Sequence, residues 1–376
     1  MSKAVRLLRD LIALPSVNPA FLPKGDPRAG EQRIAGFLAA TAGAAGLDVE
    51  LHEVAPGRPN VLARLTPGCP VRQRIVLAPH LDTVGAGSDA AFEPLRKRGR
   101  LHGRGACDTK GSVAAMLTAL TAVARSGRRP QQTELVFAGL VDEENGQAGS
   151  RALAAGGFKA DLAIVGEPTN LRVVTAHKGD LWLQLETRGR AAHGSRPDLG
   201  DNAVHTMARV VDLIETTYAA ALRGRRHPLL GQATVNVGTI CGGAQPNIVP
   251  DRCVISLDRR TLPGETDAGV RREVLELLRR RGLPVRLLNL RGAPCPPMET
   301  DPRRPLVRQF MIQVGQRRPI GVHYFCDAAV LSGAGIPSVV FGPGDIAQAH
   351  TADEWVSLRQ LESAVALLEG FMRSLP

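Results

Sequence analysis

The stretch RIVLAPHLD, residues 74–82, joins a short run of apolar residues directly to a histidine and an aspartate. Three further apolar runs, at 134–141, 161–165 and 337–341, are equally short and rich in strand-forming residues. Between them, residues 110–126 carry apolar side chains at the 3.6-residue spacing of a helix. Buried strands that alternate with helices predict an α/β fold, in which a mostly parallel sheet has helices on both faces. In such a sheet, functional sites form beyond the carboxyl ends of the strands.

Residues 181–290 follow a different pattern, in which strands and helices come in the order β-α-β-β-α-β. The predicted strands are 181–187, 233–240, 252–258 and 284–290, and the predicted helices are 202–222 and 266–281. This order is typical of the ferredoxin-like α+β arrangement. We therefore predict a larger α/β domain at residues 1–179 and 291–376, which ends in a helix at 357–374. A smaller α+β domain is inserted into it at residues 180–290.

The composition is that of an ordinary globular protein with a basic surface. The chain has 376 residues, of which 44% are hydrophobic, and 47 Lys and Arg against 36 Asp and Glu give a net charge of +11. The basic residues are scattered without a nucleic-acid-binding module, so we expect no nucleic-acid partner and keep a basic nucleic-acid binder as an alternative. We also expect no membrane partner, because no apolar stretch approaches about 18 residues. Six single cysteines favour a cytoplasmic location with reduced thiols.

Polar residues follow the predicted strands at the points where functional sites form. Each of them alone has a simpler interpretation, as a solvated turn, a strand end or a helix cap. Together they indicate a metal site, because carboxylates at close range repel one another unless a cation lies between them. Imidazole nitrogen and carboxylate oxygen suit Zn²⁺ or related ions. Two metal ions with one shared aspartate would use His80, Asp108, Glu144, Glu167 and His350.

Five segments around these residues resemble the zinc-dependent M20 peptidase and amidohydrolase family. They are HLDT (80–83), GRGACDTKG (103–111), DEENGQAGS (142–150), VGEPT (165–169) and AHTADEW (349–355). The family contains acetylornithine deacetylase, succinyl-diaminopimelate desuccinylase, aminoacylase and carboxypeptidase G. The resemblance begins at LIALPSVNP (11–19), runs in the family's order and covers nearly the whole chain.

The resemblance implies a dinuclear zinc site, for which Co²⁺ or Mn²⁺ are possible substitutes. His80 and Glu167 would bind one ion, and Glu144 and His350 would bind the other. Asp108 would bridge the two ions, and the peptide bond after it is commonly cis in this family. The larger domain would then be the catalytic metallohydrolase domain.

The resemblance also implies roles for residues around the metal ions. Asp82 would orient the imidazole of His80, and Glu143 would be the general base that activates a water molecule. The family uses the inserted domain as a lid and for dimerisation, so we expect a homodimer through this domain. There His193 would reach the carbonyl oxygen of the scissile amide, usually across the dimer. Asn247 and Arg260 would bind the substrate, with Arg260 holding its carboxylate.

The predicted function is hydrolysis of the amide bond of a small N-acyl amino acid or peptide. The segment AHKG (176–179) resembles the acetylornithine deacetylase branch, so we expect an acetylornithine-like substrate. A succinyl-diaminopimelate desuccinylase and a dipeptidase or carboxypeptidase of the same family are alternatives with the same machinery. A catalytically silent metal-binding homologue is the alternative that involves no reaction.

Overall fold

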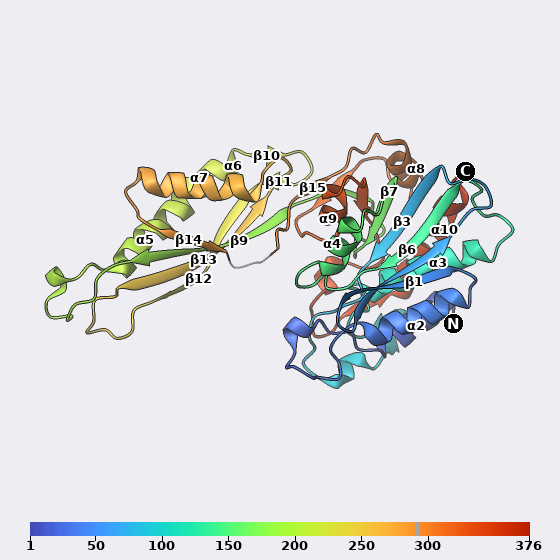
Figure 1. Cartoon of the computed structure of the whole chain (residues 1–376), viewed down its shortest axis with the longest axis horizontal. Coiled ribbons are helices and arrows are strands. Elements are labelled where there is room, and N and C mark those ends of the chain that lie inside the picture. The colour runs from blue at the N-terminus through green and yellow to red at the C-terminus, as the bar shows by residue number, and fades with distance from the viewer. Residues whose placement is uncertain (290–292) are drawn as a thin grey trace. The chain divides into compact units, whose positions relative to one another are not determined.

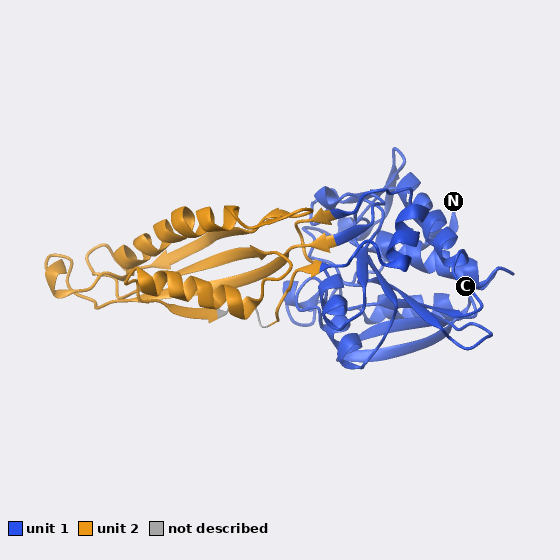
Figure 2. Ribbon diagram, turned by 90° about the horizontal axis from the view of Figure 1, so that it is seen from above, with its two compact units in different colours: residues 1–175, 299–320, 326–376 blue, residues 176–298, 321–325 orange. Residues whose placement is uncertain are grey.

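The computed structural model describes residues 1–289 and 293–376, which form two compact units (Figure 2). Unit 1 comprises residues 1–175, 299–320 and 326–376, and unit 2 comprises residues 176–298 and 321–325. The predicted boundary at 179/180 lies four residues after the first division, and the predicted boundary at 290/291 lies outside the described residues. The short segment 321–325, which the sequence pattern assigned to the larger domain, packs with unit 2.

Unit 1 is built on a mixed sheet whose central strands are parallel (Figure 1). Seven of the nine strands that the described residues form in this sheet lie in the order β1-β2-β6-β3-β7-β17-β8. In this order the strands are Asp48–Ala55, Arg58–Leu65, Thr133–Gly139, Gln73–Pro79, Leu162–Gly166, Ser338–Val340 and Val174–His177. Strands β1 and β2 are antiparallel at one edge, whereas β6, β3, β7 and β17 run parallel. Every residue of β6 and β7 is buried, as expected for strands that are covered on both faces.

Helices cover both faces of this sheet. On one face α1 (Lys3–Ile12), α3 (Lys110–Ala124) and α10 (Leu358–Arg373) pack together, with α2 (Gln32–Gly43) and α8 (Pro305–Gln313) in the same layer. Ile75 and Leu77 of β3 face this layer, whereas Val76 points to the other face. Helices α4 (Ala148–Ala155) and α9 (Ala328–Gly333) pack against each other, and α9 contacts β7 and β17. The predicted α/β fold is confirmed.

Short strands complete unit 1. Strands β4 (Leu95–Lys97), β5 (Arg100–His102) and β18 (Trp355–Ser357) form a small antiparallel sheet. This sheet pairs the segment after His350 with the segment before Asp108. The remaining two strands of the main sheet, β15 (Met298–Glu299) and β16 (Ile320–Val322), lie where the chain passes between the units.

Unit 2 has the predicted β-α-β-β-α-β order, with an antiparallel sheet in the order β12-β13-β9-β14. The strands are β9 (Gly179–Arg188), β12 (Thr234–Gly242), β13 (Arg252–Thr261) and β14 (Arg286–Asn289). The predicted helix 202–222 is a succession of α5 (Ala203–Leu213), a π-helical turn (Ile214–Tyr218) and α6 (Ala219–Arg223). The second helix is α7 (Asp267–Arg280), and β10 (Arg226–His227) and β11 (Gly231–Gln232) form a hairpin. Among the described residues, no helix has both the length and the hydropathy that a membrane crossing needs.

Candidate metal centre

The parallel strands of unit 1 bring their carboxyl ends to one edge of the sheet, and polar side chains follow there. Pro79, the last residue of β3, lies opposite Gly166, the last residue of β7. His80 then forms an isolated bridge with Leu140, just beyond β6. The residues that follow three different strands are therefore neighbours, as the sequence pattern predicted.

His80, Asp108 and Glu167 form the first of two groups of side chains that could hold a metal ion, and all three are buried. The Nε2 atom of His80 lies 3.0 Å from Asp108 Oδ1 and 3.8 Å from Glu167 Oε1. Burial alone would lower the pKa of His80, but the hydrogen bond to Asp108 and the charge of Glu167 raise it well above its ordinary value. Burial and the charge of Asp108 also raise the pKa of Glu167. The group therefore buries more negative charge than is favourable without a cation.

Asp108, Glu144 and His350 form the second group. The Nε2 atom of His350 lies 3.3 Å from Asp108 Oδ2 and 3.1 Å from Glu144 Oε2. The hydrogen bonds to Asp108 and Glu144 raise the pKa of His350 to about 10. The side chain of His350 is 54% exposed, so this group is open to solvent. His350 also has a φ of 61°, a left-handed conformation that is uncommon for residues other than glycine and that clusters at functional sites.

The two groups share Asp108, which turns one carboxylate oxygen toward each histidine. Within each group, the candidate ligand atoms lie within 4.8 Å of one another. Ligand atoms that surround a tetrahedral zinc ion at about 2.1 Å stand about 3.4 Å apart. The histidine–carboxylate distances, from 3.0 to 3.8 Å, lie on both sides of that value. The residues present therefore fit a pair of metal ions with Asp108 between them.

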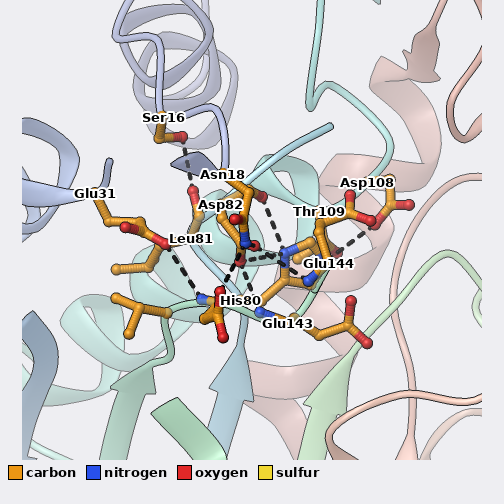
Figure 3. Close-up of polar contacts among 12 residues, drawn as sticks. Ser16, Asn18, Glu31, His80, Leu81, Asp82, Asp108, Thr109, Glu143 and Glu144 are labelled. Carbon is orange, nitrogen blue, oxygen red and sulfur yellow. Dashed lines mark hydrogen bonds and ion pairs between the residues drawn. The ribbon is translucent and has the colours of Figure 1, made fainter. Parts of the chain in front are cut away.

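Asp82 lies behind His80 and is fully buried (Figure 3). The Nδ1 atom of His80 is 3.0 Å from the backbone oxygen of Asp82 and 3.5 Å from its Oδ1, so the backbone contact is closer than the expected contact with the carboxylate. The Asp82 carboxylate accepts hydrogen bonds from the backbone N–H groups of Glu143 (3.0 Å) and Glu144 (3.1 Å). One residue thus fixes both the imidazole and the adjacent pair of glutamates.

The carboxylate of Glu143 makes no hydrogen bond or ion pair with any of the described residues (Figure 3), whereas the Glu143 backbone N–H donates to Asp82. Burial raises the pKa of Glu143 well above its ordinary value, and the charges of Glu167 and Asp327 add to this effect, which His80 opposes. A carboxyl group with a raised pKa and no fixed partner, beside candidate metal ligands, suits proton transfer.

The loop that carries Asp108 is held by Glu354, whose side chain is almost completely buried. Glu354 accepts hydrogen bonds of 2.8–2.9 Å from Arg104 Nη1 and from the backbone N–H groups of Gly105, Cys107 and Asp108. The peptide bond after Asp108 is cis, as the family resemblance implied. Glu354 lies in the segment AHTADEW that carries the family resemblance, but that segment does not indicate its contacts, because its partners lie 246 to 250 residues earlier in the chain.

In unit 2, the structure places His193 beside Asn247 but places Arg260 far from both. His193 is exposed and forms an isolated bridge with Ile248, and the Gly194 N–H donates to the backbone oxygen of Asn247 (2.7 Å). These residues lie near the start of β13. Arg260 lies near the other end of the same strand, where it binds both carboxylate oxygens of Asp258 at 2.9 Å. A ten-residue strand at about 3.3 Å per residue separates these two places by roughly 25 Å.

The chain resembles known enzymes in both sequence and fold. A model of peptidase family M20/M25/M40 matches residues 76–374. Acetylornithine deacetylase from Myxococcus xanthus is 32% identical over 308 residues, which are 79% of this chain and 79% of that protein. The structure of a tripeptidase from Staphylococcus aureus matches with a TM-score of 0.79 at 20% identity, covering 99% of this chain and 97% of that one. A dinuclear metal-binding peptidase from Bacillus subtilis matches with a TM-score of 0.71 at 13% identity, covering 98% and 96%.

Proposed function

The chain belongs to peptidase family M20/M25/M40, and we propose that it hydrolyses the amide bond of an N-acyl amino acid of the acetylornithine type. The observation that supports this most is the position of Asp108 between two histidine–carboxylate groups. The acyl-amino-acid substrate is supported by the relative that is named acetylornithine deacetylase. The resemblance of the AHKG segment to the same branch agrees with it.

Two zinc ions would occupy the site, and Co²⁺ or Mn²⁺ could replace them. His80 and Glu167 would hold one ion, Glu144 and His350 would hold the other, and Asp108 would contact both. When bound, such ions lower the pKa of a water molecule toward about 7 and polarise the amide carbonyl.

Glu143 would be the general base and acid. Its carboxyl group has a raised pKa in the metal-free cluster, and it would ionise beside two cations. It would then take a proton from the attacking water and give it to the amine nitrogen as the C–N bond breaks. Asp82 would assist indirectly, because it fixes the ring of His80 and the backbone of Glu143.

The unit 2 residues would bind and polarise the substrate. Arg260 would hold the substrate carboxylate, Asn247 would add a polar contact, and His193 would donate a hydrogen bond to the carbonyl oxygen as negative charge develops there. Within one chain, Arg260 stands roughly 25 Å from the other two residues, farther than a small substrate extends. A homodimer through unit 2 would remove this difficulty, because a second copy of the chain could supply His193 and Asn247.

A substrate panel on zinc-reconstituted protein tests this function. The panel contains N-acetylornithine, N-succinyl-diaminopimelate, a dipeptide and a carboxypeptidase substrate, each with and without a chelator. We expect N-acetylornithine or a similar acyl amino acid to give the highest kcat/KM, and we expect the chelator to abolish turnover. Turnover that survives the chelator would contradict the mechanism, and bound metal without turnover of any substrate would favour a catalytically silent homologue.

A cytoplasmic location is part of the proposal and is supported by six cysteines that are all free.

A further inference from the structure

Asn18 joins the Asp82 carboxylate (Figure 3) to a second buried carboxylate, that of Asp142. Asn18 is fully buried, and its Nδ2 donates to Asp82 Oδ2 (2.8 Å) and to Asp142 Oδ1 (2.9 Å). Its Oδ1 accepts a hydrogen bond from the backbone N–H of Ala20 (3.0 Å). The amide therefore cannot rotate without losing all three bonds, and it links two carboxylates that would otherwise repel each other.

Arg58 holds the other side of this link. Its Nε and Nη2 form two hydrogen bonds with Glu31 (2.7 and 2.6 Å), and its Nη1 donates to Asp142 Oδ1 (2.9 Å). Glu31 also accepts the backbone N–H of Asp142 (3.2 Å). The exposed fractions of the three side chains are 15% for Arg58, 0% for Glu31 and 8% for Asp142. Arg58 thus holds the side chain of Asp142 directly, and it holds the Asp142 backbone through Glu31.

This network ends at the metal centre. Asp142 directly precedes the proposed general base and the metal-binding glutamate, and its φ of 67° is a left-handed conformation that needs support from its surroundings. Asp82, which the network reaches through Asn18, accepts the backbone N–H groups of both glutamates. The turn at residues 142–146 is therefore held at its start by Arg58 and over the next two residues by Asp82.

We propose that Arg58 and Asn18 are positioning residues of the metal centre. Arg58 holds Asp142, and Asn18 carries this constraint to Asp82, so that His80 and the glutamate pair keep the arrangement in which they bind metal. This inference rests on the proposed function, because it assumes that metal ions occupy the site. Fold stability alone explains the network poorly, since buried ion pairs can often be replaced by apolar side chains at little cost.

Three variants and one control test the inference. Arg58→Met removes the guanidinium, and Arg58→Lys keeps its charge but cannot form the forked set of bonds. Asn18→Leu removes all three side-chain hydrogen bonds of Asn18 at similar size. The matched control is Arg74→Met, because Arg74 also pairs with a buried carboxylate, that of Glu134, but lies near the amino end of β3, away from the metal centre.

The first measurement is calorimetric titration of Zn²⁺ alone into the metal-free full-length chain, with thermal unfolding recorded in parallel. We expect Arg58→Met and Asn18→Leu to weaken Zn²⁺ binding about 10–100-fold, the usual effect of losing a residue that orients metal ligands. Arg58→Lys should weaken Zn²⁺ binding less. Arg74→Met should bind Zn²⁺ as tightly as the wild type, even if its Tm falls as far as that of Arg58→Met. Unchanged Zn²⁺ affinity in folded Arg58→Met would overturn the inference. If Arg58→Met does not fold, unchanged Zn²⁺ affinity in both Arg58→Lys and Asn18→Leu would overturn the inference.

The second measurement is hydrogen exchange at the backbone amides of Glu143 and Glu144 in the metal-free protein. The inference predicts faster exchange at these two amides in Arg58→Met and in Asn18→Leu, and no change in Arg74→Met. This readout separates the two proposals: a wild-type chain that binds no Zn²⁺ defeats the proposed function, whereas the exchange rates still decide whether the network holds the turn. Equal exchange in the wild type and Arg58→Met would overturn the inference.

Discussion

Replacing Glu354 by glutamine tests how the loop that carries Asp108 is held. Glu354 Oε1 accepts the N–H groups of Cys107 and Asp108, and Oε2 accepts Arg104 Nη1 and the N–H of Gly105. Glutamine can keep its oxygen toward the first pair, but it then turns an NH₂ group toward two donors. The lost charged hydrogen bond is worth about 1.5–3 kcal/mol, and the unpaired buried N–H costs about 1–3 kcal/mol. We therefore expect Glu354→Gln to lower the free energy of unfolding by about 2.5–6 kcal/mol.

Urea unfolding of the metal-free protein at pH 7 measures this loss. The chain has two tryptophans, and in a Trp182→Phe background the fluorescence of Trp355 reports on unit 1 alone. The control is Glu50→Gln, because Glu50 is 46% exposed and its ion pair with Arg64 spans 3.4 Å, so its loss should cost less than about 1 kcal/mol. A loss in Glu354→Gln no larger than in Glu50→Gln would refute the view that Glu354 holds the loop.

Three further predictions concern the chemistry of the site. Glu143→Gln should keep two zinc ions per chain by elemental analysis while kcat falls about 10²–10⁴-fold, and a loss of zinc would instead make Glu143 a ligand. In the metal-free protein, hydrogen bonds to two carboxylates raise the pKa of His350 from 6.5 to about 10, so their stabilising effect is complete below pH 6.5 and is lost as the pH rises through 10. The difference in unfolding free energy between the wild type and His350→Ala should shrink over that range in urea titrations, and a constant difference would contradict the assignment. Mixing inactive His193→Ala with inactive Glu143→Gln should restore part of the activity if His193 acts across a dimer, whereas no recovery in mixed dimers would place His193 in the site of its own chain.

The candidate metal ligands could be predicted from the sequence because the parallel fold itself brings them together. Residues that follow β3, β6 and β7 must share an edge, so finding the strands also located His80, Glu144 and Glu167 near one another. The periodicity in unit 2 likewise predicted the element order.

The supporting contacts could not be predicted in this way. Asn18 meets Asp142 across 124 residues, and Arg58 meets the same aspartate across 84 residues, so neither pairing leaves a periodic signal. The π-helical turn Ile214–Tyr218 was missed for another reason: one wider turn leaves the surrounding helical periodicity nearly unchanged.

The most direct test of the account is the position of zinc in a crystal of the zinc-loaded protein, measured by anomalous scattering at the zinc edge. We predict two peaks about 3.5–4 Å apart, each beside one histidine, with the Asp108 carboxylate in contact with both. A single peak, or two peaks that do not share Asp108, would contradict the claim that this aspartate joins two metal ions.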